Sequence, residues 1–280
     1  GRTPSGSAVT SRRDTPNRKD FMDSVEQALR LIRQGDLEKI VLARATCLSL
    51  GGKIDPMDLI GRLKPYTNNA YLFCFQPNPN EAFVSMSPER LFKATGKYIQ
   101  SEALAGTCPR SENEQDDASL GRALLHNEKN RREHLFVLDA IRNAFEHVCS
   151  ETRMDPNVSL ALVADCQHLL ARIEGILDAS KSDHDLLTSL HPTPAVGGLP
   201  VQQALKYIAE LEPFDRGWYA APIGWVGHDA SEFIPGIRSA RIHNDTITLY
   251  AGAGIVDGSD PEKEWSEVDT KIKPFLKVLR

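Results

Sequence analysis

Apolar and polar positions alternate with two different periods along the chain, and the first clear pattern is helical. From Lys19 the apolar residues recur every three or four positions, and Gly35 supplies a stop signal. The stripe consists of Phe21, Val25, Ala28, Leu29 and Ile32. Residues 39–50 are apolar and rich in β-branched side chains, which predicts a strand that ends at Gly51 and Gly52. Residues 1–18 have no apolar period, and we expect a flexible tail or a remnant of a linker there.

The rest of the chain alternates short strand-like runs with a few amphipathic helices. Strands are predicted at 70–76, 82–86, 90–95, 97–104, 219–227, 232–243 and 246–251. Helices are predicted at 130–149, at about 200–211 and from about 261 onward. The 130–149 helix has one apolar stripe, made of Leu135, Leu138, Ile141, Phe145 and Val148. The strand spacing indicates antiparallel meanders, so we expect a single α+β domain over residues 19–280.

Charge and cysteine usage narrow the class of protein. The formal net charge is −5 and no long basic run occurs, which argues against nucleic acid as a partner. No apolar run is long enough to span a bilayer and no signal peptide is evident, so we expect no membrane partner and a cytoplasmic location, or a plastid if the source is a plant. The five cysteines are scattered without a C-x-x-C motif, which favours reduced thiols over disulfides.

The last predicted helix carries a regular row of charged residues. Glu264, Glu267 and Lys271 are spaced i, i+3 and i+7, which places them on one face. The apolar stripe beside them is formed by Trp265, Val268 and Ile272. This charged face is either simply solvated or a binding site for a hard cation such as Mg²⁺, which prefers carboxylate oxygens.

A second acidic candidate lies at the start of the 130–149 helix. Glu133 is either a first-turn acid favoured by the helix dipole or a further metal ligand. It is not part of an H-E-x-x-H motif, and His126, His134 and His191 lack the pairing that a zinc site needs. The sequence therefore argues against zinc.

Three further residues are candidates whose individual signals are weak. Lys39 begins a predicted strand, where a lysine is usually solvated, although partial burial would let it act as a general base. Glu89 lies in a predicted turn and could donate a proton. Arg238 lies within a predicted strand and would be costly to bury unpaired, which implies an acidic partner or an anionic ligand.

The glycine-rich segment 251–260 follows the last predicted strand. It is not a complete G-x-G-x-x-G fingerprint, because Asp257 stands where the third glycine would be. Two interpretations stay open. The segment is a tight turn whose backbone N–H groups approach an anion, or it is a turn with a purely structural role.

Eight stretches taken together resemble the chorismate-utilising enzymes, and the isochorismate synthases in particular. They run in the family's order from about residue 20 to the end. They are EKIVLAR (38–44), SPERLF (87–92), SEALAGT (101–107), KNRREH (129–134), LHPTPAVGGLP (190–200), EPFDRGWYAAPIGW (212–225), SEFIPGIRSA (231–240) and AGAGIVDGSDPEKEWSEVDTK (251–271). The resemblance implies stacked antiparallel β-sheets flanked by helices, with the site in a cleft between them. Members of the family usually carry a further N-terminal segment that this chain lacks.

The resemblance also implies a catalytic pair and a metal site. Lys39 matches the base that activates water for attack on ring carbon 2, and Glu89 matches the acid that protonates the hydroxyl leaving carbon 4. Glu133 and Glu267 match direct Mg²⁺ ligands, with Glu264 acting through water. The metal would hold the ring carboxylate of chorismate.

The remaining matched positions imply contacts with the substrate. Arg238 and Tyr219 match residues that bind the enolpyruvyl carboxylate, and Lys271 lies nearby. His191 is expected to pack against the ring. Close backbone contacts are expected from Ala105, Gly106, Thr107, Gly252, Ala253 and Gly254.

The implied activity is the reversible, Mg²⁺-dependent isomerisation of chorismate to isochorismate, for menaquinone or phylloquinone biosynthesis. Salicylate synthase stays open as an alternative, since it shares the lysine at position 39. Anthranilate synthases generally lack that lysine, and aminodeoxychorismate synthases carry a lysine where Ala105 stands, so the aminating relatives fit less well. We therefore expect no glutamine amidotransferase subunit. A non-catalytic chorismate-binding fragment is the third alternative.

Overall fold

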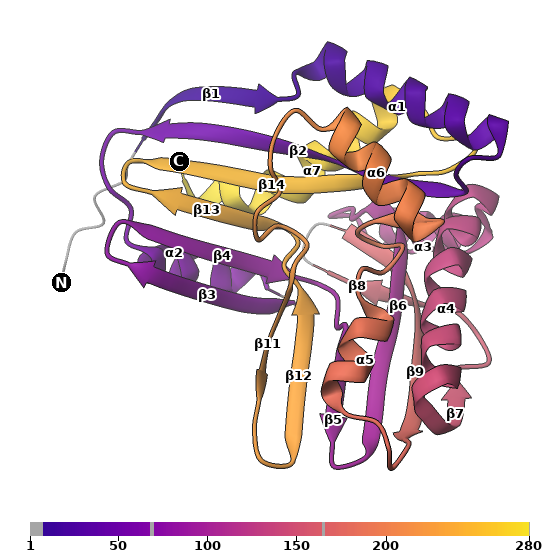
Figure 1. The fold of residues 1–280 in the computed structure, drawn as a ribbon. Coiled ribbons are helices and arrows are strands. Elements are labelled where there is room, and N and C mark those ends of the chain that lie inside the picture. The colour runs from indigo at the N-terminus through magenta and orange to yellow at the C-terminus, as the bar shows by residue number, and fades with distance from the viewer. Residues whose placement is uncertain (1–7, 68–69, 164–165, 280) are drawn as a thin grey trace.

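Two antiparallel sheets lie side by side and helices cover them (Figure 1). The computed structural model describes residues 8–67, 70–163 and 166–279. Within these residues each sheet has seven strands. The first sheet has the order β1 (Val9–Thr15), β2 (Lys39–Leu50), β14 (Thr246–Ile255), β13 (Ser239–His243), β4 (Glu81–Ser87) and β3 (Tyr71–Asn78), with β10 (Gly198–Leu199) paired to β2. The second has the order β11 (Pro222–Val226), β12 (Ala230–Pro235), β5 (Phe92–Thr95), β6 (Tyr98–Pro109), β9 (Cys166–Leu177) and β7 (Cys149–Met154), with β8 (Ser159–Leu162) paired to β9. This arrangement confirms the expected fold class.

Each sheet has its own set of helices. The first sheet is packed by α1 (Arg18–Gln34), α2 (Pro56–Leu63), α6 (Val201–Leu211) and α7 (Pro261–Val278). The second is packed by α3 (Glu114–His126) and α4 (Glu128–Val148), and α5 (Asp183–Leu190) lies against α4. A short 3-10 helix, Lys64–Tyr66, follows α2. Apolar side chains form a separate core in each half, one between the first sheet and α1, α6 and α7, and one between the second sheet and α4.

The predicted first helix is confirmed, and its ends have the expected chemistry. The Asn17 side chain accepts a hydrogen bond from the Asp20 N–H, which caps the start of α1. Gly35 ends the helix in the left-handed conformation with φ of 85°, which a residue without Cβ adopts at no steric cost.

The expected tail over residues 1–18 is wrong from residue 9 onward. Val9–Thr15 form β1, which pairs antiparallel with β2, and Asn17 caps α1. Polar side chains fit this strand because it lies at the edge of the sheet, with most of its residues exposed. Residues 1–7 lie outside the described residues.

Three other expectations need correction. The predicted strand 232–243 is two strands, β12 and β13, with Arg238 between them at φ of 45°. The predicted strand 246–251 continues to Ile255, so Gly252 and Gly254 lie within β14 rather than in a turn. Leu135 does not share the buried stripe of α4 and is 47% exposed, because the stripe in this helical turn runs through His134 instead.

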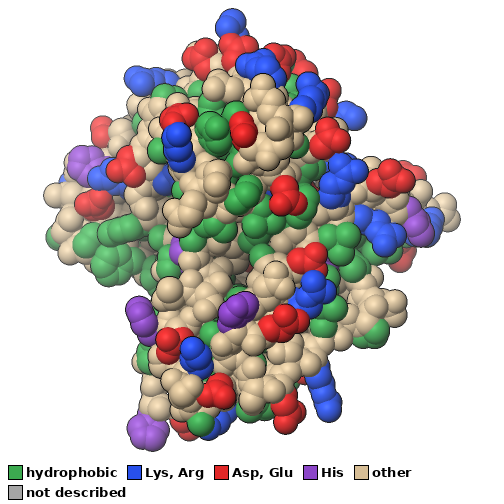
Figure 2. All heavy atoms as spheres, turned by 45° about the vertical axis from the view of Figure 1, so that its right-hand side comes forward, with side chains coloured by type: hydrophobic (Ala, Val, Ile, Leu, Met, Phe, Trp, Pro, Cys, Tyr) green, Lys and Arg blue, Asp and Glu red, His purple; other side chains and the backbone are tan. Residues whose placement is uncertain are grey.

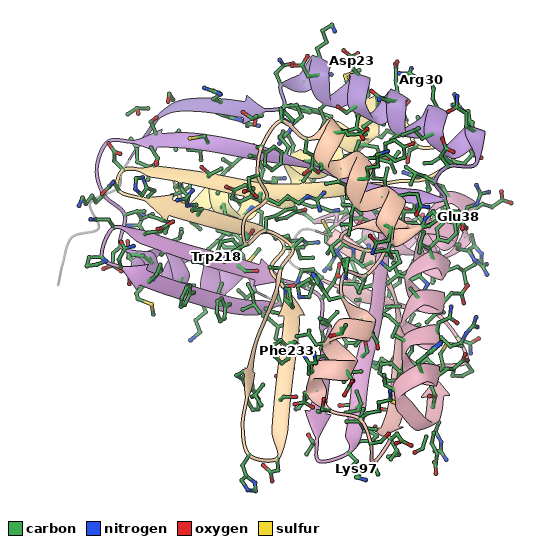
Figure 3. The ribbon with its side chains drawn as sticks, in the orientation of Figure 1. Asp23, Arg30, Glu38, Lys97, Trp218 and Phe233 are labelled. Carbon is green, nitrogen blue, oxygen red and sulfur yellow. The ribbon has the colours of Figure 1, made fainter. Side chains whose placement is uncertain are left out.

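The hairpin of β11 and β12 is tied to both sheets by aromatic side chains (Figure 3). Trp218, just before β11, makes edge-to-face contacts with Phe75 of β3 and Phe83 of β4. Phe233 of β12 stacks on Phe92 of β5 at a centroid distance of 5.1 Å. Such pairs add to the stability that apolar burial alone provides.

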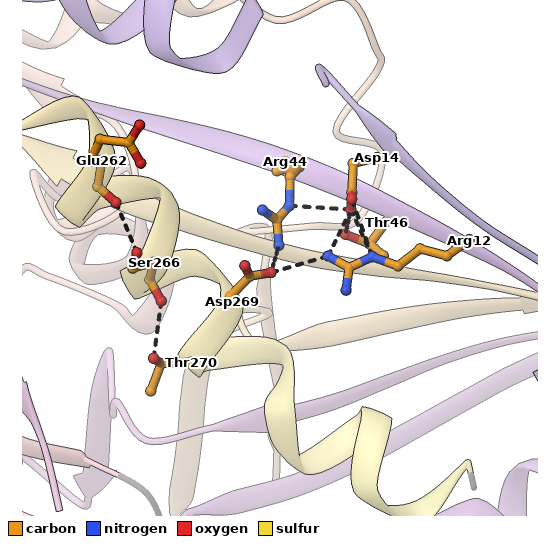
Figure 4. Close-up of polar contacts among 8 residues, drawn as sticks. All are labelled: Arg12, Asp14, Arg44, Thr46, Glu262, Ser266, Asp269 and Thr270. Carbon is orange, nitrogen blue, oxygen red and sulfur yellow. Dashed lines mark hydrogen bonds and ion pairs between the residues drawn. The ribbon is translucent and has the colours of Figure 1, made fainter. Parts of the chain in front are cut away.

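Helix α7 is anchored to the first sheet by a buried arginine (Figure 4). Arg44 of β2 is fully buried, with its Nη2 2.6 Å from Oδ1 of Asp269 and its Nε 3.5 Å from Oδ1 of Asp14. Its guanidinium lies 4.0 Å from the centre of the Trp265 ring, which adds a cation–π contact. These contacts fix the rotation of α7 about its axis, and with it the direction of the charged face that carries Glu267.

Candidate active site

A cavity lies where the two sheets meet, and most of the predicted site residues line it. Strands β2 and β14 of the first sheet contribute to its wall, and so do β6 and β9 of the second. The predicted residues in its lining are Glu89, Ala105, Gly106, Thr107, Glu133, Tyr219, Arg238, Gly252, Gly254 and Lys271. Segments more than 180 positions apart in sequence thus contribute to one site.

Lys39 lies directly behind this wall as the first residue of β2. Its side chain is fully buried, and its Nζ is 3.2 Å from Oε1 of Glu133 on α4. That contact is an ion pair without hydrogen-bond geometry, so the buried ammonium has no hydrogen-bond partner in the part of the chain that the structure describes. Burial alone would raise the pKa of Glu133, but Lys39, Lys271 and Lys129 outweigh it and hold the pKa below the ordinary value of a glutamate.

Two glycines of β14 make room for these side chains. A Cβ at Gly254 would lie 2.1 Å from Oε1 of Glu133 and 3.1 Å from Cε of Lys39. A Cβ at Gly252 would lie 2.8 Å from the Tyr219 hydroxyl. The glycines therefore serve the close approach of side chains from other elements, which fits neither interpretation of a turn.

Gly106 allows a β-bulge in β6. The register with β9 shifts between Ala105 and Thr107, and Gly106 has φ of 73° at this bulge. Ala105, Gly106 and Thr107 all line the cavity at this bulge.

Arg238 is 6% exposed, and a histidine rather than an acid lies beside it. Its Nη2 donates to Nε2 of His168 at 2.6 Å, and Nδ1 of His168 lies 3.1 Å from the Thr107 hydroxyl. Burial, followed by the charges of Arg238 and Lys271, lowers the pKa of His168 well below its ordinary value. The imidazole is therefore neutral, and the positive charge of Arg238 is left for an anion in the cavity.

Glu89 follows β4 in the loop that leads to β5. Burial raises its pKa to about 7, although Lys271, Lys39 and Arg238 act in the opposite direction. A carboxyl group with this pKa is partly protonated near neutral pH, so it can donate a proton there.

Lys271 and Tyr219 complete the polar wall. The Lys271 ammonium donates to the Gly252 carbonyl at 2.8 Å and pairs with Oε1 of Glu267 at 2.7 Å. Burial raises the pKa of Tyr219 to about 12, so its hydroxyl stays protonated and can donate to an anion. Tyr219 stacks on Tyr250 at a centroid distance of 5.8 Å, which fixes the ring.

Glu264 and Glu267 face a neighbouring cavity that shares Thr107 with the first. Glu264 is 1% exposed and accepts from the Lys129 ammonium at 2.5 Å. Burial and the nearby Glu267 carboxylate raise the pKa of Glu264, while Lys129 opposes them. Carboxylate oxygens suit a hard cation, but in the described part of the chain no three His, Cys, Asp or Glu residues are grouped so as to hold a metal ion.

Two predicted contact residues lie away from the cavity lining. His191 ends α5, and its Nδ1 is buried without a hydrogen-bond partner among the described residues. Ala253 alternates with the two glycines along β14, so its side chain points into the core of the first half.

Two site residues escaped the sequence analysis. His168 lies in β9, to which no element was assigned, although its flanks are apolar and could have indicated a buried strand. Lys129 lies within the quoted KNRREH stretch, four positions before Glu133, and this i, i+4 spacing is a signal for a shared helix face.

On the face drawn in Figure 2, acidic and basic side chains are interspersed. None of the described helices combines the length and the apolarity needed to cross a membrane.

Comparison with known proteins gives a consistent result. The family model described as "Chorismate binding enzyme" matches residues 2–280. Isochorismate synthase MenF of Bacillus subtilis is 40% identical over 273 residues, which are 97% of this chain and 58% of that protein. Isochorismate synthase 2, chloroplastic, of Arabidopsis thaliana is 39% identical, with 98% and 49% covered. The solved structure of MenF, the menaquinone-specific isochorismate synthase from Escherichia coli, superposes with a TM-score of 0.92 at 34% identity, covering 100% of this chain and 65% of that one. The chain thus spans about half to two thirds of the length of these relatives.

Proposed function

Because the chain belongs to the chorismate-binding enzyme family, we propose that it is an isochorismate synthase. The reaction would add water at carbon 2 of the chorismate ring and release the hydroxyl of carbon 4 as water. The ring double bonds shift between these positions, so substrate and product are isomers. The enzyme is then an isomerase whose substrate carries two carboxylates.

The observation that carries this proposal is the presence of two buried groups at one cavity, with Lys39 behind its wall and Glu89 in its lining. Lys39 is a fully buried amine for which the described residues supply no hydrogen-bond partner, and Glu89 is a buried carboxyl group whose pKa is raised to about 7. An amine is the kind of group that can act as a general base, and a carboxyl group with this pKa can donate a proton near neutral pH. Hydration of one ring carbon with departure of hydroxide from another needs both.

In the proposed mechanism each of the two residues handles one proton. Neutral Lys39 takes a proton from water as the water oxygen bonds to carbon 2. Glu89 gives its proton to the oxygen that leaves carbon 4, so no free hydroxide is released. Each general acid or base typically contributes about a hundred- to ten-thousandfold to the rate.

The charges of the cavity suit a dianion. Arg238, whose neighbour His168 is neutral, can hold the enolpyruvyl carboxylate through two parallel hydrogen bonds, and Tyr219 can donate a third. For the ring carboxylate we propose Mg²⁺, held by Glu133 and Glu267 with Glu264 acting through water. When bound, the cation would neutralise and orient that carboxylate.

The relatives favour the menaquinone branch. The Escherichia coli structure is named menaquinone-specific, and its chain superposes over all of this one. A salicylate biosynthesis isochorismate synthase of Pseudomonas aeruginosa is 38% identical, which keeps the salicylate branch as the second candidate.

One assay separates isochorismate synthase activity from salicylate synthase and aminating activities. Purified protein is incubated with chorismate and Mg²⁺, and isochorismate, salicylate, pyruvate and aminated products are resolved by chromatography. We expect isochorismate without pyruvate, and no conversion by Lys39→Ala, which should still bind chorismate. Pyruvate and salicylate would identify the salicylate synthase, and full isochorismate formation by Lys39→Ala would refute the assigned base.

A further inference from the structure

Each of the three carboxylates assigned to the metal is paired with a lysine. The pairs are Glu264 with Lys129 at 2.5 Å, Glu267 with Lys271 at 2.7 Å, and Glu133 with Lys39 at 3.2 Å. Three negative charges therefore face three positive ones, and the group is neutral without a cation. This pairing is a physical reason why the described residues contain no group of carboxylates arranged to receive a metal.

Lys129 differs from the other two lysines because it has no role in the proposed reaction. Lys39 is the proposed base, and Lys271 also donates to the Gly252 carbonyl. The Lys129 ammonium interacts electrostatically with all three carboxylates, Glu264 most strongly. Its ammonium thus lies where a positive charge interacts favourably with all three carboxylates.

The two ends of the Lys129–Glu264 pair differ in their access to water. Glu264 is 1% exposed, whereas the Lys129 side chain is 27% exposed and lines the neighbouring cavity. The lysine can therefore swing into water on its flexible stem, while the carboxylate is fixed in the first turn of α7. An exchange of cations at Glu264 requires only that Lys129 move.

We propose that Lys129 is a built-in competitor of the divalent cation. In the metal-free protein its ammonium holds the buried Glu264 carboxylate, and it leaves that carboxylate when the cation binds. The inference rests on the metal site of the proposed function. It makes Lys129 a residue that sets the affinity of the site for the cation, and it explains how a buried carboxylate is kept paired before the cation arrives.

The test is a calorimetric titration of the metal-free protein with Mg²⁺ alone. Lys129→Met keeps most of the side-chain volume and removes the charge. We expect it to bind Mg²⁺ about tenfold more tightly or better, because both competition and repulsion are relieved. Lys263→Met is the matched control, since Lys263 is an exposed lysine on the wall of the same cavity. It should change the affinity less than about twofold, because an exposed charge is screened.

A second measurement uses the wild-type chain, in case the variant folds poorly. Amine acylation at Lys129, followed by mass spectrometry, should become faster when Mg²⁺ is added, because the ammonium loses its carboxylate partner. Equal or weaker Mg²⁺ binding by Lys129→Met overturns the inference, and so does acylation that Mg²⁺ leaves unchanged or slows. If the wild-type chain binds no Mg²⁺ even with chorismate present, the metal site of the proposed function fails instead.

Discussion

Replacing Glu89 with glutamine should change how the stability of the protein depends on pH. The glutamate has an ordinary pKa of 4.5 in the unfolded chain and a pKa of about 7 in the folded protein, mainly because burial penalises its charged form. Between these two values the folded state binds the proton that the unfolded state releases. Stability from this group is therefore full below the unfolded pKa and is lost as the pH rises through the folded pKa.

The size of the effect follows from the shift. A difference of about 2.5 pKa units corresponds to about 3 kcal/mol between low pH and pH values above 7. Glutamine has a similar shape and does not titrate, so it does not incur this loss. Relative to the wild type, Glu89→Gln should gain about 2–3 kcal/mol of unfolding free energy between about pH 5 and about pH 8.

Urea denaturation of both proteins across this pH range measures the difference directly. The control is Glu146→Gln on α4, which makes the same substitution at a side chain that is 59% exposed. Parallel pH curves for wild type and Glu89→Gln would show that the carboxyl group is not penalised by burial. The same assignment predicts that turnover of the wild type falls above about pH 7, as the proposed acid loses its proton.

Three further substitutions test other parts of the structure. Gly254→Ala puts a methyl group 2.1 Å from Oε1 of Glu133 and 3.1 Å from Cε of Lys39. It should abolish turnover while the melting temperature stays nearly constant, since only the ends of these two side chains must move; normal turnover would contradict this packing. Asp269→Ala removes the carboxylate that lies 2.6 Å from the buried Arg44 guanidinium, and it should lower the free energy of unfolding by about 2 kcal/mol. Urea denaturation measures this loss, and no loss would mean that the pair does not anchor α7. In Arg238→Lys the lysine cannot form two parallel hydrogen bonds with a carboxylate, so chorismate binding measured by calorimetry should weaken about tenfold or more. Normal affinity in a less stable variant would mean that the arginine has a structural role.

Sequence periodicity was sufficient where local packing decides the structure. The stripe from Phe21 to Ile32 and the stop at Gly35 predicted α1 almost to the residue, because one helix face meets one core. The apolar run 39–50 likewise is β2 with the predicted bounds. The site residues were recognised from their matching stretches rather than from the period, since Lys39, Glu89 and Arg238 are each weak signals alone.

Other features follow from contacts between distant segments, which no local pattern contains. The mostly polar segment Val9–Thr15 forms a strand because β2 offers it an edge. Arg238 lies between β12 and β13, where its guanidinium donates to His168. Gly252 and Gly254 were predicted to lie in a turn, but they lie within a strand and leave room for side chains of other elements.

The sequence by itself thus determined several of the helices and strands, the fold class and the kinds of group available for chemistry. Only the tertiary structure decided which charges meet. The raised pKa of Glu89 comes from burial among segments far apart in the chain, and the neutral state of His168 comes from burial beside Arg238. The role proposed for Lys129 likewise depends on its contact with Glu264, which lies 135 positions later in the chain. Electrostatic free energies depend on distance and burial in three dimensions, so a one-dimensional pattern cannot contain them.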